Sequence, residues 1–188
     1  MILIAARLHD TFGPGIATTY KVIGEPEDLA GAQQLANDDK FQFQVWALGL
    51  VGARPLEMKK GADRGIDGRL YFHDAADASE TKEALISVKG GGVSVTHVRD
   101  LRGTVEREAA AVGVLLCMEE PTRPMLREAA DAGFYTSPAG TQHARLQILT
   151  VEQLLNGQKL DLPAWHDVRT FKKASKAKGA GRKDAELF

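Results

Sequence analysis

The residues best suited to chemistry are an aspartate and a lysine in the middle of the chain. Asp67 lies in a Gly-Ile-Asp-Gly turn (65–68), and 20 residues later an apolar run ends in Ser-Val-Lys (87–89). A carboxylate and an ammonium group held side by side can bind a divalent cation and a phosphate and can activate water for phosphodiester hydrolysis. Taken alone, the same residues also fit a strand-entry turn whose aspartate accepts from local N–H groups, followed by a surface lysine.

The composition bounds the class of protein. The 188 residues are enough for one domain with a sizeable core. Hydrophobic residues make up 44% of the chain and charged residues 26%, as in an ordinary globular protein. The formal net charge of −1 gives no overall attraction to DNA or to a membrane, so any nucleic-acid surface must be local.

The single cysteine, Cys117, lies in the apolar run 112–118, which predicts a buried thiol and excludes an intrachain disulfide. No apolar run approaches the roughly 20 residues that span a bilayer, and the first residues lack the basic flank of a secretory signal. We therefore expect a cytoplasmic protein without membrane contact. His73, His97 and His143 are too scattered to predict a metal cluster.

The apolar pattern predicts alternating helices and strands. Residues 1–37 are rich in turn formers, and we interpret them as an N-terminal arm with a strand-like stretch at Thr18–Ile23 and a short helix at Pro26–Ala36. The predicted order is then helix, three strands, helix, strand, helix, strand and helix, at 38–52, Arg54–Lys59, Ile66–His73, Glu83–Lys89, Val95–Ala111, Val112–Met118, Pro124–Ala132, Arg145–Leu149 and Val151–Leu155.

This order predicts an α/β fold with three layers, in which a central mixed sheet is flanked by helices. The first three strands should form an antiparallel meander, and the later strands should be joined through helices by right-handed crossovers. We expect this core to span 38–163. The remaining segment, 164–188, carries seven Lys and Arg residues between 169 and 183 and no acid there, which predicts a disordered tail that is either solubilising or a strap for phosphates.

Parts of the sequence resemble a known family. The glycine-rich turn 61–68, the Ser-Val-Lys run at 87–89 and the helix and strand that follow resemble the Mrr-like branch of the PD-(D/E)xK restriction-endonuclease superfamily. Over about residues 3–163 the chain is similar to the C-terminal region of large bacterial exocyclic-amine (N-4/N-6) DNA methyltransferases, through the runs Trp46–Pro55, Leu70–Asp74 and Glu119–Met125. The resemblance implies a restriction-endonuclease-like core.

The resemblance also implies a metal centre. Asp67 and the carbonyl of Val88 would hold Mg²⁺ or Mn²⁺, which bind oxygen ligands and retain several waters. Lys89 would orient the attacking water or help to deprotonate it, and would offset charge in the transition state. Hydrolysis would release a 3′-hydroxyl and a 5′-phosphate.

Two acids of the family's site are missing here. Ser87 stands where a second acid would be, and a serine hydroxyl binds metal weakly. The helix acid that some relatives supply is also missing, because Gln42 and Gln44 occupy its neighbourhood. Asp63 is the first candidate for a compensating ligand and Glu57 the next.

The expected function is that of a metal-dependent DNA endonuclease of the restriction-modification type, tethered to a DNA methyltransferase or acting beside it. The alternatives are a catalytically lapsed nuclease fold that serves as a DNA-binding or docking module of that methyltransferase, and a partner-binding domain without affinity for DNA. The chain lacks the Asn/Asp-Pro-Pro-aromatic motif and the glycine-rich cofactor loop of a methyltransferase, so we do not expect it to methylate DNA by itself. We expect a segment of a longer polypeptide or a stand-alone product, with double-stranded DNA as partner and a homodimer as the form that cuts both strands.

Basic side chains near this centre and in the tail are expected to contact phosphates: Lys59, Lys60, Arg64, Arg99, Arg102, Lys172 and Lys173. On the helix at 95–111, pairing with neighbouring acids into a charge lattice is an equal alternative. The three glycines at 90–92 either let the backbone approach DNA closely or form a flexible loop.

Overall fold

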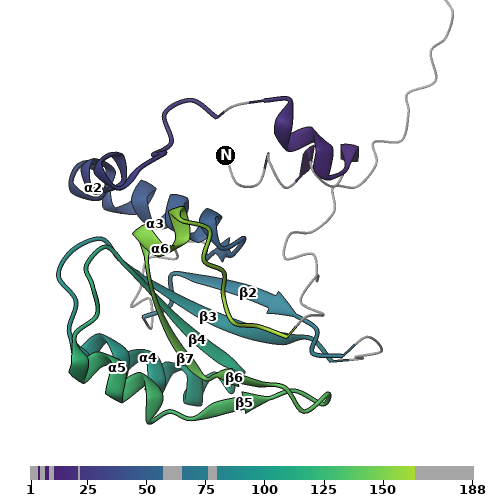
Figure 1. The fold of residues 1–188 in the computed structure, drawn as a ribbon, viewed down its shortest axis with the longest axis vertical. Helices are drawn as coiled ribbons and strands as arrows, with labels where there is room; N and C mark the ends of the chain where they lie inside the picture. Colours follow the sequence, from purple (N-terminus) through teal and green to yellow (C-terminus); the bar gives the residue numbers. More distant parts are fainter. Residues whose placement is uncertain are drawn as a thin grey trace, which may run out of the picture.

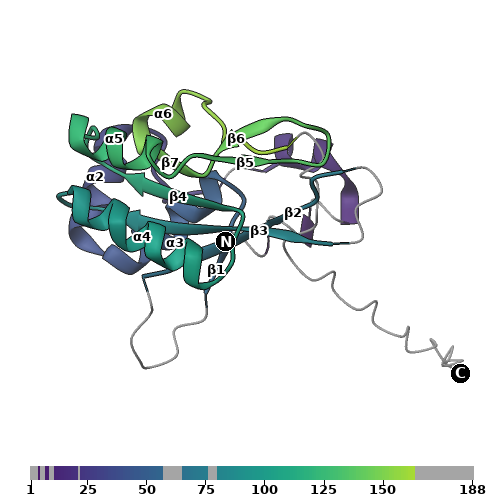
Figure 2. The same ribbon diagram turned by 90° about the horizontal axis from the view of Figure 1, so that it is seen from below.

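The computed structural model describes residues 4, 7–8, 11–20, 22–56, 65–75 and 80–163. Its centre is a five-stranded sheet with the strands in the order β1 (Arg54–Pro55), β2 (Gly68–Phe72), β3 (Lys82–Lys89), β4 (Val112–Cys117) and β7 (Leu146–Thr150). One face is covered by α4 (Val95–Arg107) and α5 (Arg123–Ala130). The other face is covered by α2 (Leu29–Asp38), α3 (Lys40–Leu50) and α6 (Val151–Leu155), as Figures 1 and 2 show.

This arrangement confirms the predicted fold class, a three-layer α/β core with a mixed sheet. The first three strands form the expected antiparallel meander, with Arg69 opposite Leu85. Strands β3, β4 and β7 are parallel, and α4 and α5 lie in the connections between them, so each step is a crossover through a helix. The strand β1 has only two residues, and the rest of the predicted strand beyond Leu56 lies outside the described residues.

One expectation for the N-terminal region is wrong. The stretch Thr18–Ile23 was expected to be strand-like, but Thr18 is the last residue of a 3-10 helix, η1 (Pro14–Thr18). Its hydroxyl donates to the carbonyl of Gly15 at 2.9 Å, and the N–H of Thr19 donates to Ile16 at 2.9 Å. Local side-chain and turn hydrogen bonds therefore prevail over the β-propensity of Thr18 and Thr19.

The helices α2 and α3 start where short acidic side chains can cap them. Asp28 accepts from the N–H of Gly31 at 2.7 Å, and Asp39 accepts from the N–H of Gln42 at 2.9 Å. Helix α2 buries Ala32 and Ala36 in the main core, so the packed unit includes residues upstream of 38, the expected start of the domain.

Helix α4 ends earlier than the predicted Ala111. Its last residue is Arg107, and Ala109 has a left-handed backbone with φ of 53°, a conformation that turns the chain towards β4. The N–H of Ala110 donates to the carbonyl of Val105 at 3.0 Å. This is the C-capping hydrogen bond of a Schellman motif, in which glycine usually takes the left-handed position that Ala109 has here.

A short hairpin was not predicted from the sequence. Strands β5 (Phe134–Thr136) and β6 (Gln142–Ala144) pair antiparallel outside the main sheet, between α5 and β7. The hairpin is bound to the end of β2, because Tyr135 donates its hydroxyl to Asp74 and packs its ring edge against Phe72.

Two apolar layers hold the sheet between its helices. Ile86, Val88 and Leu116 face the layer formed with α2, α3 and α6, and Leu85 and Leu115 face the layer under α4 and α5. Cys117 is fully buried, as expected, and burial raises the pKa of its thiol to about 11. Among the described residues no helix is both long and apolar enough to cross a membrane.

Two glycines give opposite expectations for the same substitution. In Gly113→Ala the new Cβ would lie 2.6 Å from Val105 Cγ2 and 2.7 Å from Leu146 Cδ2, so we expect the free energy of unfolding to fall by about 1–3 kcal/mol. In Gly103→Ala, inside α4, the Cβ meets nothing within 4 Å, so we expect a gain of about 0.5–1 kcal/mol. Urea unfolding followed by circular dichroism measures both, and equal effects would contradict the packing of α4 on β4.

Candidate functional site

Asp67 lies where β2 stops pairing with β3. Its backbone N–H donates to the carbonyl of Ile86 at 2.9 Å, and its carbonyl accepts from Leu56 at 3.1 Å. Strand β3 continues to Lys89 beyond this point without β2 beside it. The carboxylate of Asp67 therefore stands beside the last residues of β3.

Four donors converge on this carboxylate. The N–H of Val88 and the hydroxyl of Ser87 donate to Oδ2, at 2.7 Å and 3.3 Å. The side-chain amide of Gln44, on α3, donates to Oδ1 at 3.2 Å. The ammonium of Lys89 lies 3.9 Å from Oδ2.

These contacts differ in strength. The short bond from the Val88 N–H to an ionised carboxylate is charge-assisted and is the strongest of the four. The side chains of Asp67 and Lys89 are 19% and 30% exposed, so water screens their ion pair and its contribution to stability is small. The carboxylate is thus held mainly by the backbone and by two neutral side chains.

The described residues do not make up a Mg²⁺ site on their own. Mg²⁺ requires near-octahedral oxygen ligands and usually binds one or two carboxylates. Within the described ranges no three His, Cys, Asp or Glu side chains gather into a possible metal site. The carbonyl of Val88 faces the same side of β3 as its N–H, as alternation along a strand requires, so it is available beside Asp67. Asp63 and Glu57, the expected compensating acids, lie outside the described residues.

The structure brings together the expected residues Asp67, Ser87, Val88 and Lys89. It also shows Gln44, one of the two glutamines in the neighbourhood of the family's helix acid, hydrogen-bonded to Asp67. An acid at position 87 would have predicted a complete metal centre from the sequence. In the described part of the chain, the centre therefore keeps its lysine and one acid.

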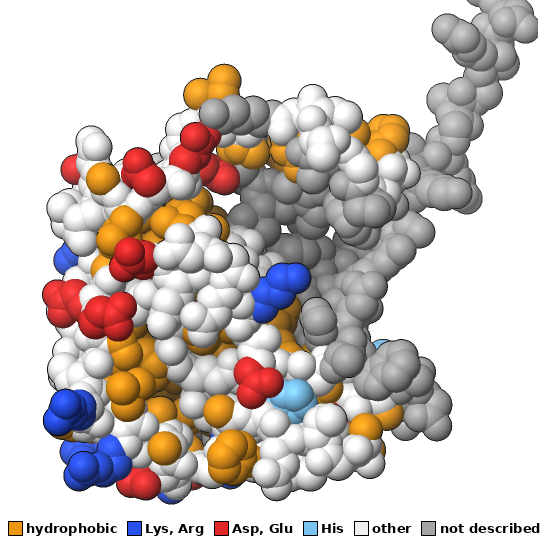
Figure 3. All heavy atoms as spheres, viewed as in Figure 1, with side chains coloured by type: hydrophobic (Ala, Val, Ile, Leu, Met, Phe, Trp, Pro, Cys, Tyr) orange, Lys and Arg blue, Asp and Glu red, His pale blue; other side chains and the backbone are white. Residues whose placement is uncertain are grey.

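Most of the expected DNA contacts cannot be placed. Lys59, Lys60, Arg64, Lys172 and Lys173 lie outside the described residues. The other two, Arg99 and Arg102, lie on α4 and pair with Glu128 of α5, at 2.9 Å and 3.6 Å, in the region where Figure 3 shows Lys and Arg side chains gathered. Arg102 also pairs with Glu106 at 3.3 Å, so the charge lattice that was expected as an alternative is present on this helix.

The three glycines after Lys89 have different surroundings. A Cβ on Gly90 would lie 3.0 Å from the ring of Phe43 and 3.1 Å from Ala36, so this glycine lets α2 and α3 pack against the end of β3. Gly91 and Gly92 have nothing within 4 Å of such a Cβ, so their backbone is open. They lead into Ser94, the N-cap of α4.

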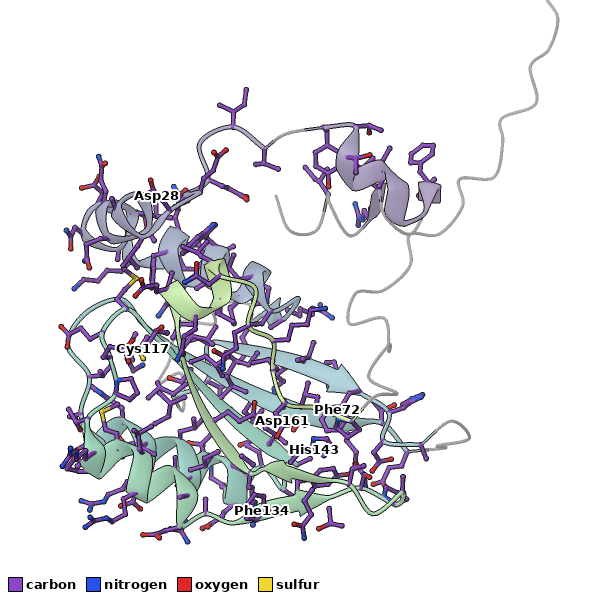
Figure 4. The ribbon with its side chains drawn as sticks, viewed as in Figure 1. Asp28, Phe72, Cys117, Phe134, His143 and Asp161 are labelled. Carbon is purple, nitrogen blue, oxygen red and sulfur yellow. The ribbon has the colours of Figure 1, made fainter. Side chains whose placement is uncertain are left out.

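A second polar cluster, which the sequence did not reveal, lies away from Asp67. His143 on β6 contacts Asp161 at 2.8 Å and the hydroxyl of Thr141 at 2.9 Å, and Figure 4 shows His143 and Asp161 side by side. The side-chain amide of Gln147 donates to the carbonyl of Asp161 at 2.8 Å. These contacts fasten the segment after α6 to the hairpin and to β7.

The role of Asp67 can be tested without any substrate. Asp67→Ala leaves the buried N–H of Val88 without its acceptor, so we expect the free energy of unfolding to fall by about 1–3 kcal/mol. Asp67→Asn should cost less, because the new amide oxygen can accept from Val88 while Gln44 turns its own amide to accept. Urea unfolding with and without millimolar Mg²⁺ measures this. An increase in stability on removing the charge would instead indicate a cluster of repelling acids.

A solved structure has the same fold. The chain is similar to the structure of the MspJI restriction endonuclease in complex with a 27-mer oligonucleotide, with 19% identity and a TM-score of 0.50 over 72% of this chain. It spans 31% of that larger protein, and at this identity the likeness concerns the fold. No curated protein matches the chain.

A protein family matches most of the core. The family described as NACHT-associated inactive Restriction Endonuclease 1 matches residues 42–156, more than half of the chain. The match runs from α3 to α6 and includes Gln44, Asp67, Ser87 and Lys89. The restriction-endonuclease-like identity expected from the sequence is thereby confirmed, and the chain belongs to the family of NACHT-associated inactive Restriction Endonuclease 1 domains.

Proposed function

We propose that this chain is a non-catalytic nuclease fold that binds duplex DNA along the phosphate backbone without cutting it. One observation supports the absence of catalysis. The carboxylate of Asp67 accepts three hydrogen bonds from the protein, and Ser87 lies beside it where a second acid would be. Hydrolysis at such a centre requires a metal that activates water. The description of the family as inactive supports this half of the proposal.

The surface around Lys89 supports DNA binding. Its ammonium is partly exposed, and the open backbone of Gly91 and Gly92 leads from it to the N-terminus of α4, whose partial positive charge favours phosphate. The similar solved structure, of MspJI, is a complex with a 27-mer oligonucleotide, which fits the same role. Three of the basic residues named above as DNA contacts precede Asp67 by no more than eight positions in the sequence.

An active endonuclease is the second candidate. It is favoured by the short distance between Lys89 and Asp67, the pair that a metal-dependent nuclease would use. This candidate requires Mg²⁺ or Mn²⁺ held by Asp67, the carbonyl of Val88 and a further acid, of which Asp63 is the first choice. It would also require two copies of the chain to cut both strands.

We further propose that the chain acts as part of a larger protein or assembly. The family description associates such domains with NACHT, and we place a NACHT partner ahead of the DNA methyltransferase that the sequence resemblance suggests. The Mrr-like character, the methyltransferase link and the cytoplasmic location remain predictions of the sequence.

The proposal predicts binding without cleavage. Fluorescence anisotropy with a labelled DNA duplex should show an affinity that falls steeply as the salt concentration rises. In Lys89→Ala, the slope of log K against log[salt] should become shallower by about the amount that one phosphate contact contributes. Lys159→Ala, which removes another exposed lysine, is the matched control and should leave the slope unchanged. Supercoiled plasmid incubated with Mg²⁺ or Mn²⁺ should stay intact.

Metal-dependent nicking that both Asp67→Ala and Lys89→Ala abolish would establish the endonuclease instead. Absence of any salt-sensitive binding would overturn the DNA-binding half of the proposal and leave a docking module. Methylated and unmethylated plasmids should behave alike if the chain contacts only phosphates.

Restoring the missing acid tests why the centre lapsed. Ser87 is buried, so Ser87→Glu should lower the free energy of unfolding by roughly 3 kcal/mol without metal, because it places a second carboxylate beside Asp67. Millimolar Mn²⁺ should raise its thermal midpoint while leaving the unsubstituted chain unchanged. Ser87→Gln is the control of equal size without charge, and an equal response of both variants to Mn²⁺ would contradict the interpretation.

A further inference from the structure

A groove of about 460 Å³ lies at the opposite end of the sheet from Lys89. It is lined by the start of β3 and the residues before it, the end of the α4–β4 connection, strand β5 and Arg145, that is by 80–83, 109–111, 134–136 and 145. None of these residues belongs to the centre around Asp67. In Figure 4, Phe134 marks the hairpin side of this region.

Strand β5 turns an unpaired edge outwards. The N–H of Arg145 donates to Gly133 at 3.0 Å and the N–H of Ser137 donates to Thr141 at 2.9 Å, so the hydrogen-bonded pairs of the hairpin fall at odd positions of β5. By alternation, the N–H and carbonyl groups of Phe134 and Thr136 point away from β6. β6 shows the same alternation, because the N–H of Ala144 points away from β5 and donates to Asp161.

A second unpaired edge borders the groove. Strand β3 begins before its neighbour β4, because Ala84 is opposite Val112, the first residue of β4. The carbonyl of Glu83 accepts from Ala111 at 3.0 Å, which shows that odd positions of β3 turn their backbone groups towards β4. Thr81 precedes β4 altogether, so its backbone groups on that side have no strand beside them. One extended segment could therefore pair with β5 and lie beside β3.

The side chains of the groove select the kind of segment. Phe134 is 65% exposed and, with the alanines at 109–111, offers an apolar wall. The charges of Lys82 and Glu83 are already balanced, by Glu80 at 2.6 Å and Arg69 at 2.7 Å. Arg145 forms no ion pair with any residue that the structure describes, so it is the cation left to meet an acid.

The edge of β5 is also held in place before anything binds. Tyr135 is anchored to Asp74 and Phe72 at the end of β2, and His143 on β6 is anchored to Asp161. A strand that adds to a fixed edge does not have to order that edge, which lowers the entropic cost of binding.

We propose that this groove binds an extended segment of a partner protein, which adds as a strand to β5. The segment carries an acidic side chain that meets Arg145 and aliphatic or aromatic side chains that pack against Phe134. Main-chain hydrogen bonds to Phe134 and Thr136 supply affinity, and the alternate side chains supply selectivity.

The test uses the full chain and the capped peptide acetyl-Val-Thr-Val-Glu-Val-Thr-Val-amide, followed by ¹⁵N NMR and amide hydrogen exchange. We expect the amides of Phe134 and Thr136 to shift and to gain protection while that of Gln142 does not. Thr136→Pro removes an outward N–H on the groove side and should weaken binding about tenfold, the equivalent of one hydrogen bond. Gln142→Pro is the matched control, because Gln142 is opposite Thr136 and its outward N–H lies on the far edge of the hairpin.

Charge selectivity has its own measurement. Replacing the peptide's Glu by Lys should weaken binding to the unsubstituted chain, and Arg145→Gln should remove that difference. The proposal is overturned if the peptide leaves residues 134–136 unaffected, or if Gln142→Pro weakens binding as much as Thr136→Pro in variants with native circular dichroism. Two results without peptide would also overturn the proposal. If the amide of Thr136 is protected and loses this protection when residues 164–188 are removed, the groove holds this chain's own tail. If the protection depends on protein concentration, the groove holds a second copy.

Discussion

The candidate site depends on one hydrogen bond, from the backbone N–H of Val88 to the carboxylate of Asp67. Strand β2 leaves β3 at this point, so Val88, which is buried, has no strand to accept its N–H. A buried donor without a partner would cost free energy comparable to a lost hydrogen bond. The carboxylate of Asp67 supplies the hydrogen-bond acceptor that β3 lacks where β2 diverges from it. An acid at position 67 therefore has a structural reason to be present, whether or not a metal ever binds there.

This structural role would let the fold keep its shape without the chemistry of a nuclease, as the proposed function requires. Ser87 and Gln44 stand where acids would repel Asp67 in the absence of a metal, and both donate to it instead. Neutral donors around a single carboxylate are stable without a cation, whereas a cluster of buried carboxylates is not. Lys89 adds a partly screened positive charge on the open side. Among the described residues, these four thus form a cluster in which the single carboxylate has its partners without a metal.

The sequence predicted the elements with long periodic patterns and missed those set by contacts between distant residues. The strands β3, β4 and β7 and the helices of the core follow from apolar runs and caps, and the pairing of Asp67 with Lys89 followed from a family resemblance. The β5–β6 hairpin has strands of three residues, too short for a pattern, and its position depends on Tyr135 reaching Asp74. In the same way, Arg99 was expected either to contact phosphates or to join a charge lattice on its own helix. Its partner Glu128 is 29 residues away on another helix, so the sequence pattern did not show this pair. Stretches with no regular pattern follow local hydrogen bonds that a propensity scale does not include, as Thr18 and Thr19 do at the end of η1.

The anchoring of the hairpin has a mechanical consequence. The hairpin is fastened to β2 through Tyr135 and Asp74 and to the segment after α6 through His143 and Asp161, while Gln147 of β7 also binds Asp161. Asp161 is only two residues from the end of the described part of the chain. A force applied at the C-terminal end would therefore divide at Asp161 between the hairpin and strand β7 before it reached α6. Part of that load would pass to the hairpin, and through Tyr135 and Asp74 to the end of β2.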